Sequence, residues 1–519
     1  MERIEAKMNG NFKSSVDVCF ILEGTYPFVS GGVSTWVHQA ISTMPDLSFA
    51  IHYIGAQAGA VGKSKYDVPS NVVSIEKVFI FDNEAEDCDQ EIDSRIEDEM
   101  QQAFDLLFAS FQSTDRESEL FRKAVSQFEK VAAVVPFEIF WKHSLTWEYL
   151  QKAYRSYYPG ESFTSCFWNT RFILKPVWEL LRSFSRLPRA RVYHSVSTGY
   201  AGFLGAVAKY ELDRPFLLSE HGIYVRERIT DLLNQEWSPT LAADFARPPA
   251  GISLMRQTWI DLFIYLGRFC YDSADHITSL FERNARFQEE FGADRDKIEI
   301  IPNGINPGRF RTIEKKREDM RKSNPERKTV GFLGRIVSIK DVRTLIRAAK
   351  HVCDEISDAE FLLVGPTDED PEYFESCQSL IRDLNLDSRV TLTGPKKLEE
   401  ALPLFDIMVL SSISEGLPFA VLESFAANIP VVSTDVGSCS ELIHGVSGNE
   451  LPGGIVVPVA DAAQLAEAII TLLKDRSLQN TYGNNGKERV YRCYQEEDVM
   501  RRFQNHYIRL GQQTTEQVH

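Results

Sequence analysis

Two glutamates on either side of a short apolar stretch are the first candidates for chemistry in this 519-residue sequence. Glu415 and Glu423 lie in the segment SSISEGLPFAVLESFAAN (411–428). We expect a buried strand to end near Ser411 and a helix to begin at Pro418, because proline suits the first helical position. A rise of about 1.5 Å per residue then places the two carboxylates roughly 10 Å apart. That distance is close to the span from a ribose to a sugar across a diphosphate.

The start of the predicted helix offers a place for the diphosphate itself. Free backbone N–H groups and the positive end of the helix dipole both attract phosphate oxygens. We therefore expect Gly416, Leu417 and Pro418 to bind the same ligand as the two glutamates. A pair of glutamates at this spacing is common and could instead be a loop acid and a solvated helix acid. Their position directly after a buried strand favours ligand binding.

Two basic residues follow another predicted strand, in GRIVSIKD (334–341). Arg335 and Lys340 would lie in the loop at the carboxyl end of that strand. Fixed cations at this position could neutralise a diphosphate and stabilise it as it departs. The alternative is a pair of surface bases, and the glutamate pair makes phosphate binding the better interpretation.

The N-terminal half holds two further candidates. Gly31 and Gly32, in EGTYPFVSGGVSTWVHQAI (23–41), separate a predicted strand from a helix and would let backbone N–H groups approach a ligand. An ordinary turn between a strand and a helix explains them almost as well. His221 lies at a predicted strand end in SEHGIYVRER (219–228), where a catalytic role and a structural hydrogen bond are equally open.

The elements that would position these residues follow one pattern. Short apolar runs bounded by Gly, Pro or Asp alternate with amphipathic segments, which is typical of parallel, doubly wound α/β sheets. The strands expected in the first half cover 16–24, 48–56, 190–197, 215–222, 275–281 and 297–304. Those expected in the second half are KTVGFLGRI, AEFLLVG, RVTLTG, DIMVLSS, IPVVSTD and GGIVVPV. The predicted fold is α/β, with two Rossmann-like, doubly wound domains facing a central cleft that would hold the site.

Composition divides the chain further. Residues 1–313 form the expected N-terminal domain, with a helical, aromatic-rich insertion at about 84–189 that opens on an acidic run. Residues 314–328 carry one apolar side chain among many charges, which predicts an exposed linker. Residues 329–495 form the expected C-terminal domain. Residues 496–519 form a last helix, for which we expect packing on the N-terminal domain.

The overall composition argues against several classes of protein. The chain has 57 Lys and Arg against 74 Asp and Glu, a net charge of −17, and a nucleic-acid partner would need an excess of basic residues. Eight cysteines without a C-x-x-C pair or zinc-ligand spacing argue against a disulfide scaffold, and we expect no metal. The segment GAQAGAVGKS lacks the first glycine of a P-loop. Without a secretory leader or a long apolar run, the expected location is cytoplasmic.

The motifs together resemble the retaining GT-B glycosyltransferases of family 4. The resemblance rests on the segment from Glu415 to Glu423, on GRIVSIKD, on the glycine loop, on His221 and on IPNGIN, and it extends from residue 16 to about 495. The phrases LEGTYPFVSGGVSTWVHQ and SEHGIYVRER resemble the PelF-type members, which use UDP-glucose to make an exopolysaccharide. One departure is Asn306, where the family usually has an aspartate.

The resemblance implies a role for each candidate near the predicted helix start. Glu415 would bind the hydroxyls of the donor sugar, and Glu423 would bind the ribose hydroxyls. Arg335 and Lys340 would hold the diphosphate. The implied reaction uses no protein nucleophile, no metal and no cofactor.

The remaining roles come from the same resemblance. His221 would lie beside the donor sugar, and Gly31 and Gly32 beside its phosphates. The loop VTLTGPK (390–396), with Gly394, would border the uracil. The implied partners are a UDP-sugar donor and a glycan acceptor, and a peripheral association with a membrane polysaccharide-export complex would suit such an activity.

Two other functions stay open on the sequence alone. A sugar phosphorylase or a relative of glycogen synthase would share the architecture. A catalytically inactive, sugar-nucleotide-binding subunit of a polysaccharide assembly would share the binding motifs. The intact glutamate and basic pairs argue against the inactive subunit.

Overall fold

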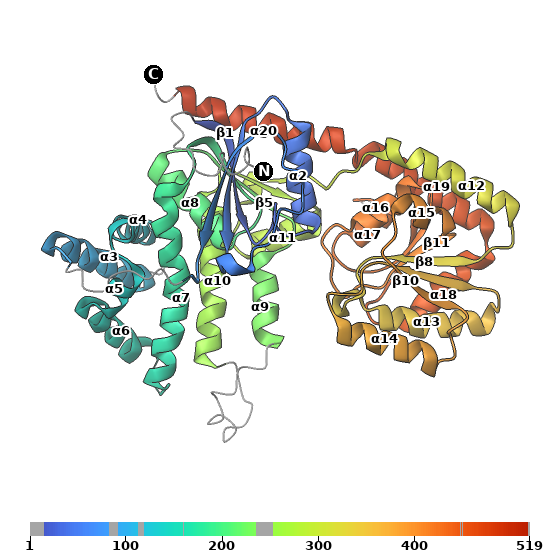
Figure 1. Ribbon diagram of the computed structural model, residues 1–519, viewed down its shortest axis with the longest axis horizontal. Coiled ribbons are helices and arrows are strands. Elements are labelled where there is room, and N and C mark those ends of the chain that lie inside the picture. Colours follow the sequence, from blue (N-terminus) through green and yellow to red (C-terminus); the bar gives the residue numbers. More distant parts are fainter. Residues whose placement is uncertain are drawn as a thin grey trace. The chain divides into compact units, whose positions relative to one another are not determined.

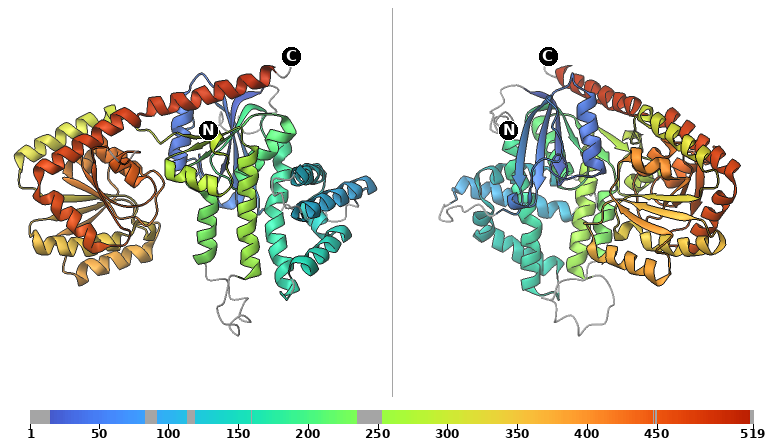
Figure 2. Two further views of the ribbon diagram at one scale, coloured as in Figure 1. Left: turned by 180° about the vertical axis from the view of Figure 1, so that it is seen from behind. Right: turned by 45° about the vertical axis from the view of Figure 1, so that its right-hand side comes forward.

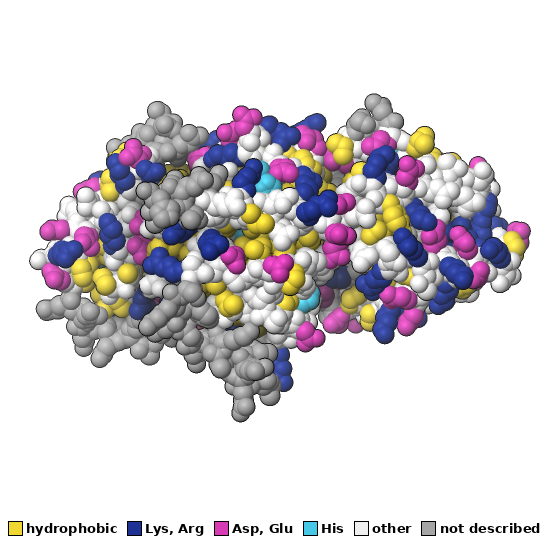
Figure 3. All heavy atoms as spheres, turned by 90° about the horizontal axis from the view of Figure 1, so that it is seen from above, with side chains coloured by type: hydrophobic (Ala, Val, Ile, Leu, Met, Phe, Trp, Pro, Cys, Tyr) yellow, Lys and Arg dark blue, Asp and Glu magenta, His cyan; other side chains and the backbone are white. Residues whose placement is uncertain are grey.

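The computed structural model describes residues 15–82, 92–112, 119–158, 160–234, 253–446, 448 and 450–516 (Figure 1). The chain divides into two compact units. Unit 1 comprises Met1–Ser279, Ala285–Glu299 and Phe503–His519, and unit 2 comprises Leu280–Asn284 and Ile300–Arg502. Residues 84–91 of the predicted acidic run lie outside the described residues. Figure 3 shows basic and acidic side chains interspersed over the face that it draws.

Unit 1 is built on a parallel sheet with the strand order β3-β2-β1-β4-β5-β6-β7. Its strands are β1 (Val16–Glu23), β2 (Phe49–Gly55), β3 (Val72–Phe79), β4 (Ala190–Ser195), β5 (Phe216–Glu220), β6 (His276–Ser279) and β7 (Ile298–Ile300). The central strands are almost continuously apolar and buried, as a sheet covered on both faces requires. Edge strand β3 was absent from our expectation, because it alternates apolar residues with Ser, Glu and Lys.

The helices of unit 1 fall into two groups. Those that alternate with its strands are α2 (Gly32–Thr43), α8 (Tyr200–Leu212), α9 (Tyr224–Asn234), α10 (Leu254–Ser273) and α11 (Glu282–Glu290), whose first turn lies in unit 2. The predicted insertion between β3 and β4 supplies α3 (Ser94–Gln112), α4 (Glu119–Val134), α5 (Phe137–Lys142), α6 (Ser144–Tyr157) and α7 (Phe163–Ser183). Helices α4 and α7 contact α8, so the insertion is anchored on a helix of the sheet layer.

The last helix, α20 (Glu496–Glu516), passes from unit 2 into unit 1 at residue 503. Its C-terminal part lies along unit 1 (Figure 2), where the Phe503 ring is 4.9 Å from that of Trp36. Tyr507 is buried and donates or accepts a 2.8 Å hydrogen bond with His194 on β4. Aromatic packing and this hydrogen bond therefore hold α20 against the sheet of unit 1. Among the described residues, no helix is long and apolar enough to cross a membrane.

Unit 2 is built on a second parallel sheet, with the strand order β10-β9-β8-β11-β12-β13. Its strands are β8 (Thr329–Leu333), β9 (Glu360–Val364), β10 (Val390–Gly394), β11 (Ile407–Leu410), β12 (Val431–Thr434) and β13 (Gly454–Val457). Its helices are α12 (Arg311–Ser323), α13 (Val342–Glu355), α14 (Pro371–Asp383), α15 (Leu398–Ala401), α16 (Phe419–Ala426), α17 (Cys439–His444), α18 (Ala462–Lys474) and α19 (Arg476–Cys493). All six strands predicted for this half are present, and α13 buries the apolar face expected of it.

The predicted linker at 314–328 is wrong in its first part, because Glu314 to Ser323 belong to helix α12 of unit 2. The reason is Arg317, which is only 3% exposed. Its guanidinium donates hydrogen bonds to the carbonyl oxygens of Phe405, Asn428 and Asp406 at 2.8, 2.9 and 3.0 Å. A charged segment can therefore pack closely when the body of the domain supplies carbonyl groups for its arginines.

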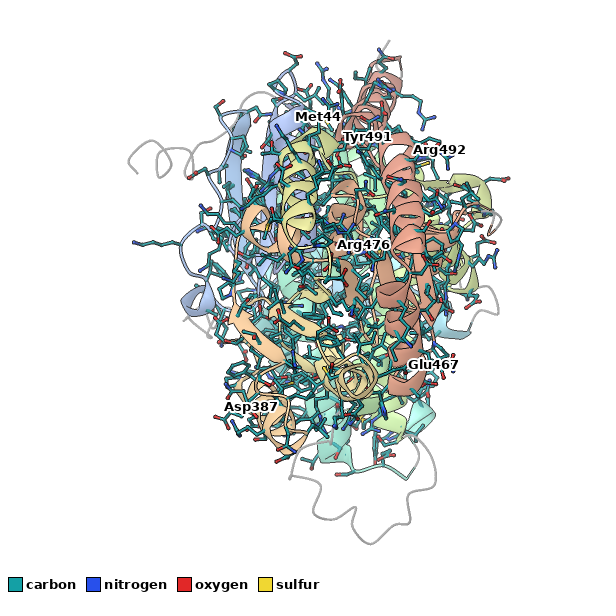
Figure 4. The ribbon with its side chains drawn as sticks, turned by 90° about the vertical axis from the view of Figure 1, so that its right-hand side faces the viewer. Met44, Asp387, Glu467, Arg476, Tyr491 and Arg492 are labelled. Carbon is teal, nitrogen blue, oxygen red and sulfur yellow. The ribbon has the colours of Figure 1, made fainter. Side chains whose placement is uncertain are left out.

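Asp406 is the buried carboxylate around which these arginines gather. Arg321, Arg327 and Arg476 approach its oxygens at 2.9, 3.2 and 3.2 Å, and the N–H of Thr329 donates to it at 2.9 Å. Burial opposes its ionisation, but the Thr329 N–H and the arginines outweigh that effect and lower the pKa of Asp406. Figure 4 labels Arg476, which opens α19, and Arg492 near the other end of that helix.

We expect Asp406→Asn to destabilise unit 2 by about 3 kcal/mol, because it leaves buried guanidinium groups without their counter-charge. Every tryptophan of the sequence lies at or before Trp259, in unit 1, so fluorescence would miss this change. Calorimetry, with hydrogen exchange of α12 and β11 peptides, measures it directly. Asp358→Asn is the matched control: it removes an exposed ion pair with Lys328 and should cost less than about 1 kcal/mol. Equal melting of both variants would contradict the expectation.

Candidate functional site

The order of strands in unit 2 determines where a ligand can bind. The chain adds β9 and β10 on one side of β8, and then β11, β12 and β13 on the other side. The loops that follow β8 and β11 therefore turn in opposite directions at the carboxyl edge of the sheet. This switch point is where open α/β sheets bind their ligands.

Lys340 and Glu415 meet at this switch point. Lys340 ends a short 3₁₀ turn after β8 (Ser338–Lys340), and its Nζ is 2.5 Å from Oε1 of Glu415, in the loop after β11. Both side chains are mostly buried, at 17% and 11% exposure. The Ser412 hydroxyl donates to the same Glu415 oxygen at 2.5 Å, and the Ser411 hydroxyl donates to the Lys340 carbonyl at 2.9 Å. The two loops thus hold each other through polar groups.

Arg335 lies in the same loop as Lys340 and is about half exposed. Its Nη1 is 2.5 Å from a carboxylate oxygen of Glu369, in the loop after β9. The sequence reasoning gave Glu369 no role, and its position in an acidic loop gave no sign of this contact. Both candidate cations are therefore paired with carboxylates of the chain itself.

Close backbone contacts hold the loops after β8, β9 and β10 together. The Gly365 N–H donates to the Gly394 carbonyl at 3.1 Å, and a Cβ on Gly365 would lie 1.8 Å from the Gly334 carbonyl oxygen. Gly394 itself has a φ of +71° and open space where a Cβ would be. The structure therefore places Gly394 at the sheet edge that carries Arg335, while its contact with a base stays a prediction.

The loop of Glu415 and Gly416 packs against the loop that follows β12. Gly437 has a φ of +52°, and a Cβ there would lie 2.3 Å from the carbonyl oxygens of Glu415 and Gly416. The N–H of Ser438 donates to the Gly416 carbonyl at 3.0 Å. Sequence reasoning missed Gly437, although a glycine directly after a strand was a usable signal.

Helix α16 begins at Phe419, one residue later than expected, and Pro418 is its N-cap. Proline has no N–H to offer, so the free N–H groups of this helix start with Phe419. Leu417 is buried, as expected for a residue that faces the sheet. Glu423 lies in the second turn, where burial raises the pKa of its carboxyl to about 7 against the weaker attraction of Arg309.

Unit 1 has its own switch point, between β1 and β4. Glu23 ends β1, and its carboxylate accepts hydrogen bonds from the Tyr200 N–H at 3.0 Å and the Tyr224 hydroxyl at 3.2 Å. Burial raises the pKa of Glu23. Our sequence reasoning assigned no role to this residue, although its place at a strand end in LEGTYP was visible.

His221 directly follows β5, and its ring is 4.8 Å from that of Trp36. Burial lowers the pKa of His221 to about 4, so the ring is neutral at pH 7. The preceding Glu220 accepts from the Tyr271 hydroxyl at 2.5 Å, the Thr198 hydroxyl at 3.0 Å and the Gln288 amide at 3.1 Å. This network fixes the strand end from which His221 projects.

Gly31 and Gly32 open helix α2 and are exposed. A Cβ at either position would meet no atom of the protein within 4 Å, so folding alone does not require glycine there. Asn306 accepts a hydrogen bond from the Gly308 N–H at 3.0 Å and caps a 3₁₀ turn. That local role is sufficient to explain its presence at this position.

The predicted residues thus form two groups. One group lies at the carboxyl edge of the sheet of unit 2, at the switch point or beside it: Arg335, Lys340, Gly394, Glu415, Gly416, Leu417, Pro418 and, on α16, Glu423. The other lies at the carboxyl edge of unit 1: Gly31, Gly32 and His221. A shared site for the two groups stays a prediction.

If this site binds UDP, as the resemblance implies, Gly437→Ala should weaken that binding at least tenfold, because the new methyl group must push the Glu415 loop out of place. Its cost in stability should be about 1–3 kcal/mol. Gly448→Ala is the matched control, since Gly448 also has a positive φ, of +69°, but open space around it. Calorimetric titration with UDP measures the difference, and equal affinities of the two variants would contradict the expectation.

Two family models match the chain, and the border between them lies close to residues 299 and 300, where unit 1 gives way to unit 2. Residues 16–296, just over half of the chain, match the family described as a domain of unknown function (DUF3492). Residues 327–475 match the family described as glycosyl transferases group 1.

Two curated relatives are similar to about four tenths of the chain. The N-acetyl-alpha-D-glucosaminyl L-malate synthase of Bacillus anthracis is 26% identical over 244 residues, which are 46% of this chain and 61% of that protein. The GDP-mannose-dependent alpha-(1-6)-phosphatidylinositol monomannoside mannosyltransferase of Mycobacterium tuberculosis H37Rv is 30% identical over 235 residues, 42% of this chain and 58% of that protein. The chain therefore spans about 60% of the length of these relatives.

Solved structures match nearly the whole chain in fold. Anabaena Alr3699/HepE in complex with UDP has a TM-score of 0.58 at 14% identity and covers 94% of this chain and 98% of its own. The sucrose-phosphate synthase of Thermosynechococcus elongatus has a TM-score of 0.58 at 16% identity, with 95% and 98% covered. With its two parallel sheets, the chain has the GT-B fold, and it belongs to the DUF3492 family.

Proposed function

We propose that this chain is a retaining glycosyltransferase that moves a hexose from a UDP-sugar, with UDP-glucose as the first candidate, to an exopolysaccharide or a similar glycan. The observation that carries the proposal is the meeting of Lys340 and Glu415 at the switch point of unit 2, beside the start of α16. A cation, a carboxylate and a helix N-terminus are the three groups that a sugar diphosphate needs.

The two ion pairs of the site suit a ligand that brings its own negative charge. A diphosphate competes for Lys340 and Arg335, which in its absence are held by Glu415 and Glu369. When Lys340 turns to the phosphates, Glu415 is released to accept hydrogen bonds from the hydroxyls of the donor sugar. Binding therefore exchanges one set of charge pairs for another: Glu415 gains the sugar hydroxyls, and Glu369, which is about half exposed, is left to water.

The proposed reaction needs no nucleophile from the protein. The bond from the anomeric carbon to the diphosphate oxygen breaks, and the acceptor oxygen bonds to that carbon on the same face. The proton of the acceptor hydroxyl moves to an oxygen of the leaving diphosphate. Arg335, Lys340 and the N–H groups of α16 stabilise the charge that develops on UDP.

Unit 1 carries the remaining candidates, His221, Gly31 and Gly32. A neutral His221 can donate or accept a hydrogen bond at the sugar without adding a charge. The open space at Gly31 and Gly32 leaves the backbone at the start of α2 accessible to a ligand.

The family match, the relatives and a solved structure also support this proposal. The match to glycosyl transferases group 1 covers the segment that holds Arg335, Lys340, Glu415 and Glu423. Both relatives are named for products or reactions that involve sugars. Anabaena Alr3699/HepE was solved with UDP-glucose. The PelF-type resemblance suggests an exopolysaccharide as the product. A cytoplasmic location and an association with a membrane export complex stay predictions.

Lys340→Met and Glu415→Gln should each lower kcat for hexose transfer from UDP-glucose by about 10²–10³-fold, because each removes a group aimed at the reacting donor. Release of UDP in the presence of glycan acceptors measures turnover, and EDTA should leave it unchanged. Lys474→Met, which removes an exposed ion pair with Glu355, is the matched control. If Glu415→Ala binds UDP-glucose normally and leaves glycan output unchanged, the chain is a binding subunit and the enzyme proposal fails.

UDP should bind more tightly as the pH rises from 6 to 8, because Glu423 has a raised pKa of about 7 and its ionised form accepts both ribose hydroxyls better. Binding at pH 7 should therefore release protons, which titration calorimetry in two buffers detects. Glu423→Gln should remove both effects. Glu467→Gln, on the exposed side of α18 (Figure 4), should retain them. Proton release that survives Glu423→Gln would show that another group is responsible.

A further inference from the structure

Three side chains from distant parts of the sequence meet in unit 1, apart from the residues discussed above. His276 opens β6, Glu299 lies in the middle of β7, and His506 projects from α20. Nε2 of His276 and Nε2 of His506 lie 3.1 and 2.8 Å from Oε2 of Glu299. The two imidazole rings are 4.2 Å apart. Both histidines are largely buried, and Glu299 is 35% exposed.

We propose that His276, Glu299 and His506 form a binding site for one divalent transition-metal cation, best suited to Zn²⁺. One ligand atom from each residue lies within 4.8 Å of the other two. Tetrahedral Zn²⁺ with bonds of about 2.0–2.1 Å holds its ligand atoms about 3.3 Å apart. Small side-chain movements would therefore admit the ion between them.

The donor set selects the kind of ion. Two imidazole nitrogens with one carboxylate oxygen suit Zn²⁺, whereas Mg²⁺ and Ca²⁺ prefer oxygen ligands. Burial, with the neighbouring His506, lowers the pKa of His276 to about 4, so its ring is neutral at pH 7 and becomes a ligand when the Nε2 proton that faces Glu299 moves to Nδ1. The exposed side of Glu299 leaves room for a water as the fourth ligand.

Arg509 binds the His506 ring in a way that disfavours metal binding, so an Arg509 variant tests the proposal. Its Nη2 donates to Nδ1 of His506 at 3.0 Å, which leaves the ring proton on Nε2, facing Glu299. Coordination through Nε2 requires that proton to move to Nδ1, and Arg509 must then turn away. Arg509 is exposed and can do so. Its removal should therefore strengthen binding.

A bound cation would fasten α20 to the edge of the sheet. Hydrogen bonds between the three side chains already join β6, β7 and α20, and coordinate bonds would replace them with stronger ones. The ion would hold the end of the chain in unit 1 without taking part in sugar transfer. The inference is thus independent of the proposed function.

The experiment uses the untagged full-length protein, freed of metal with a chelator and then dialysed. Titration with Zn²⁺ should show one tight site per chain and raise the melting temperature, and Co²⁺ should give the visible absorption of a four-coordinate site. His276→Gln, His506→Gln and Glu299→Gln should each weaken Zn²⁺ binding at least tenfold, whereas Arg509→Gln should strengthen it. His351→Asn, which removes an exposed histidine of α13, is the matched control and should bind like the unaltered chain.

The proposal is overturned if the unaltered chain binds no Zn²⁺ at micromolar concentrations. It is also overturned if Glu299→Gln and Arg509→Gln bind as the unaltered chain does, because that result would locate the metal elsewhere. These two variants alter the more exposed side chains, so they decide the question even if the histidine variants do not fold. Circular dichroism of each variant identifies that case.

Discussion

A reversal in strand order is the constraint on which each unit depends. In unit 2 the chain leaves β8 toward β9 and later returns on the other side with β11, so the loops that follow β8 and β11 separate at the sheet edge. At that point polar groups from the two loops satisfy one another. Lys340 and Glu415 do so in unit 2. Glu23, with Tyr200 and Tyr224, does so at the corresponding point of unit 1.

These two carboxylates differ in a way that matters for chemistry. Glu415 is paired with a flexible, cationic side chain that can be drawn away by phosphate. Glu23 is enclosed by a backbone N–H and a phenol, neither of which a ligand can easily displace, and burial raises its pKa. The first arrangement is exchangeable and the second is fixed. Unit 2 is therefore the better place for a ligand that must bind and leave in every turnover.

The parallel sheets and most of the residues at the unit 2 switch point could be predicted from the sequence, because buried strands and glycine- or proline-marked loops leave a local pattern. Strand β3 could not be predicted, because an edge strand with one partly exposed face lacks the continuous apolar run that identified the other strands. Helix α12 has the charged composition of an exposed linker, and only the carbonyl groups around Arg317 explain why it packs against unit 2. The contacts of Glu369 and Gly437 arise from loops that meet only in three dimensions. Contacts between such loops cannot be predicted from the spacing of residues in the sequence.

The arginines of α12 also determine where the chain can be divided. The glycosyl transferases group 1 match begins at residue 327, after Arg317 and Arg321. A fragment that begins at residue 327 would retain Asp406, which is buried directly before β11. It would lose the guanidinium group of Arg321, which pairs with the Asp406 carboxylate, and that of Arg317, which binds the Asp406 carbonyl. Gene fusion or exchange of the second domain would therefore succeed only with a junction upstream of Arg311. The boundary of the sequence motif and the boundary of the unit that folds are different positions in this chain.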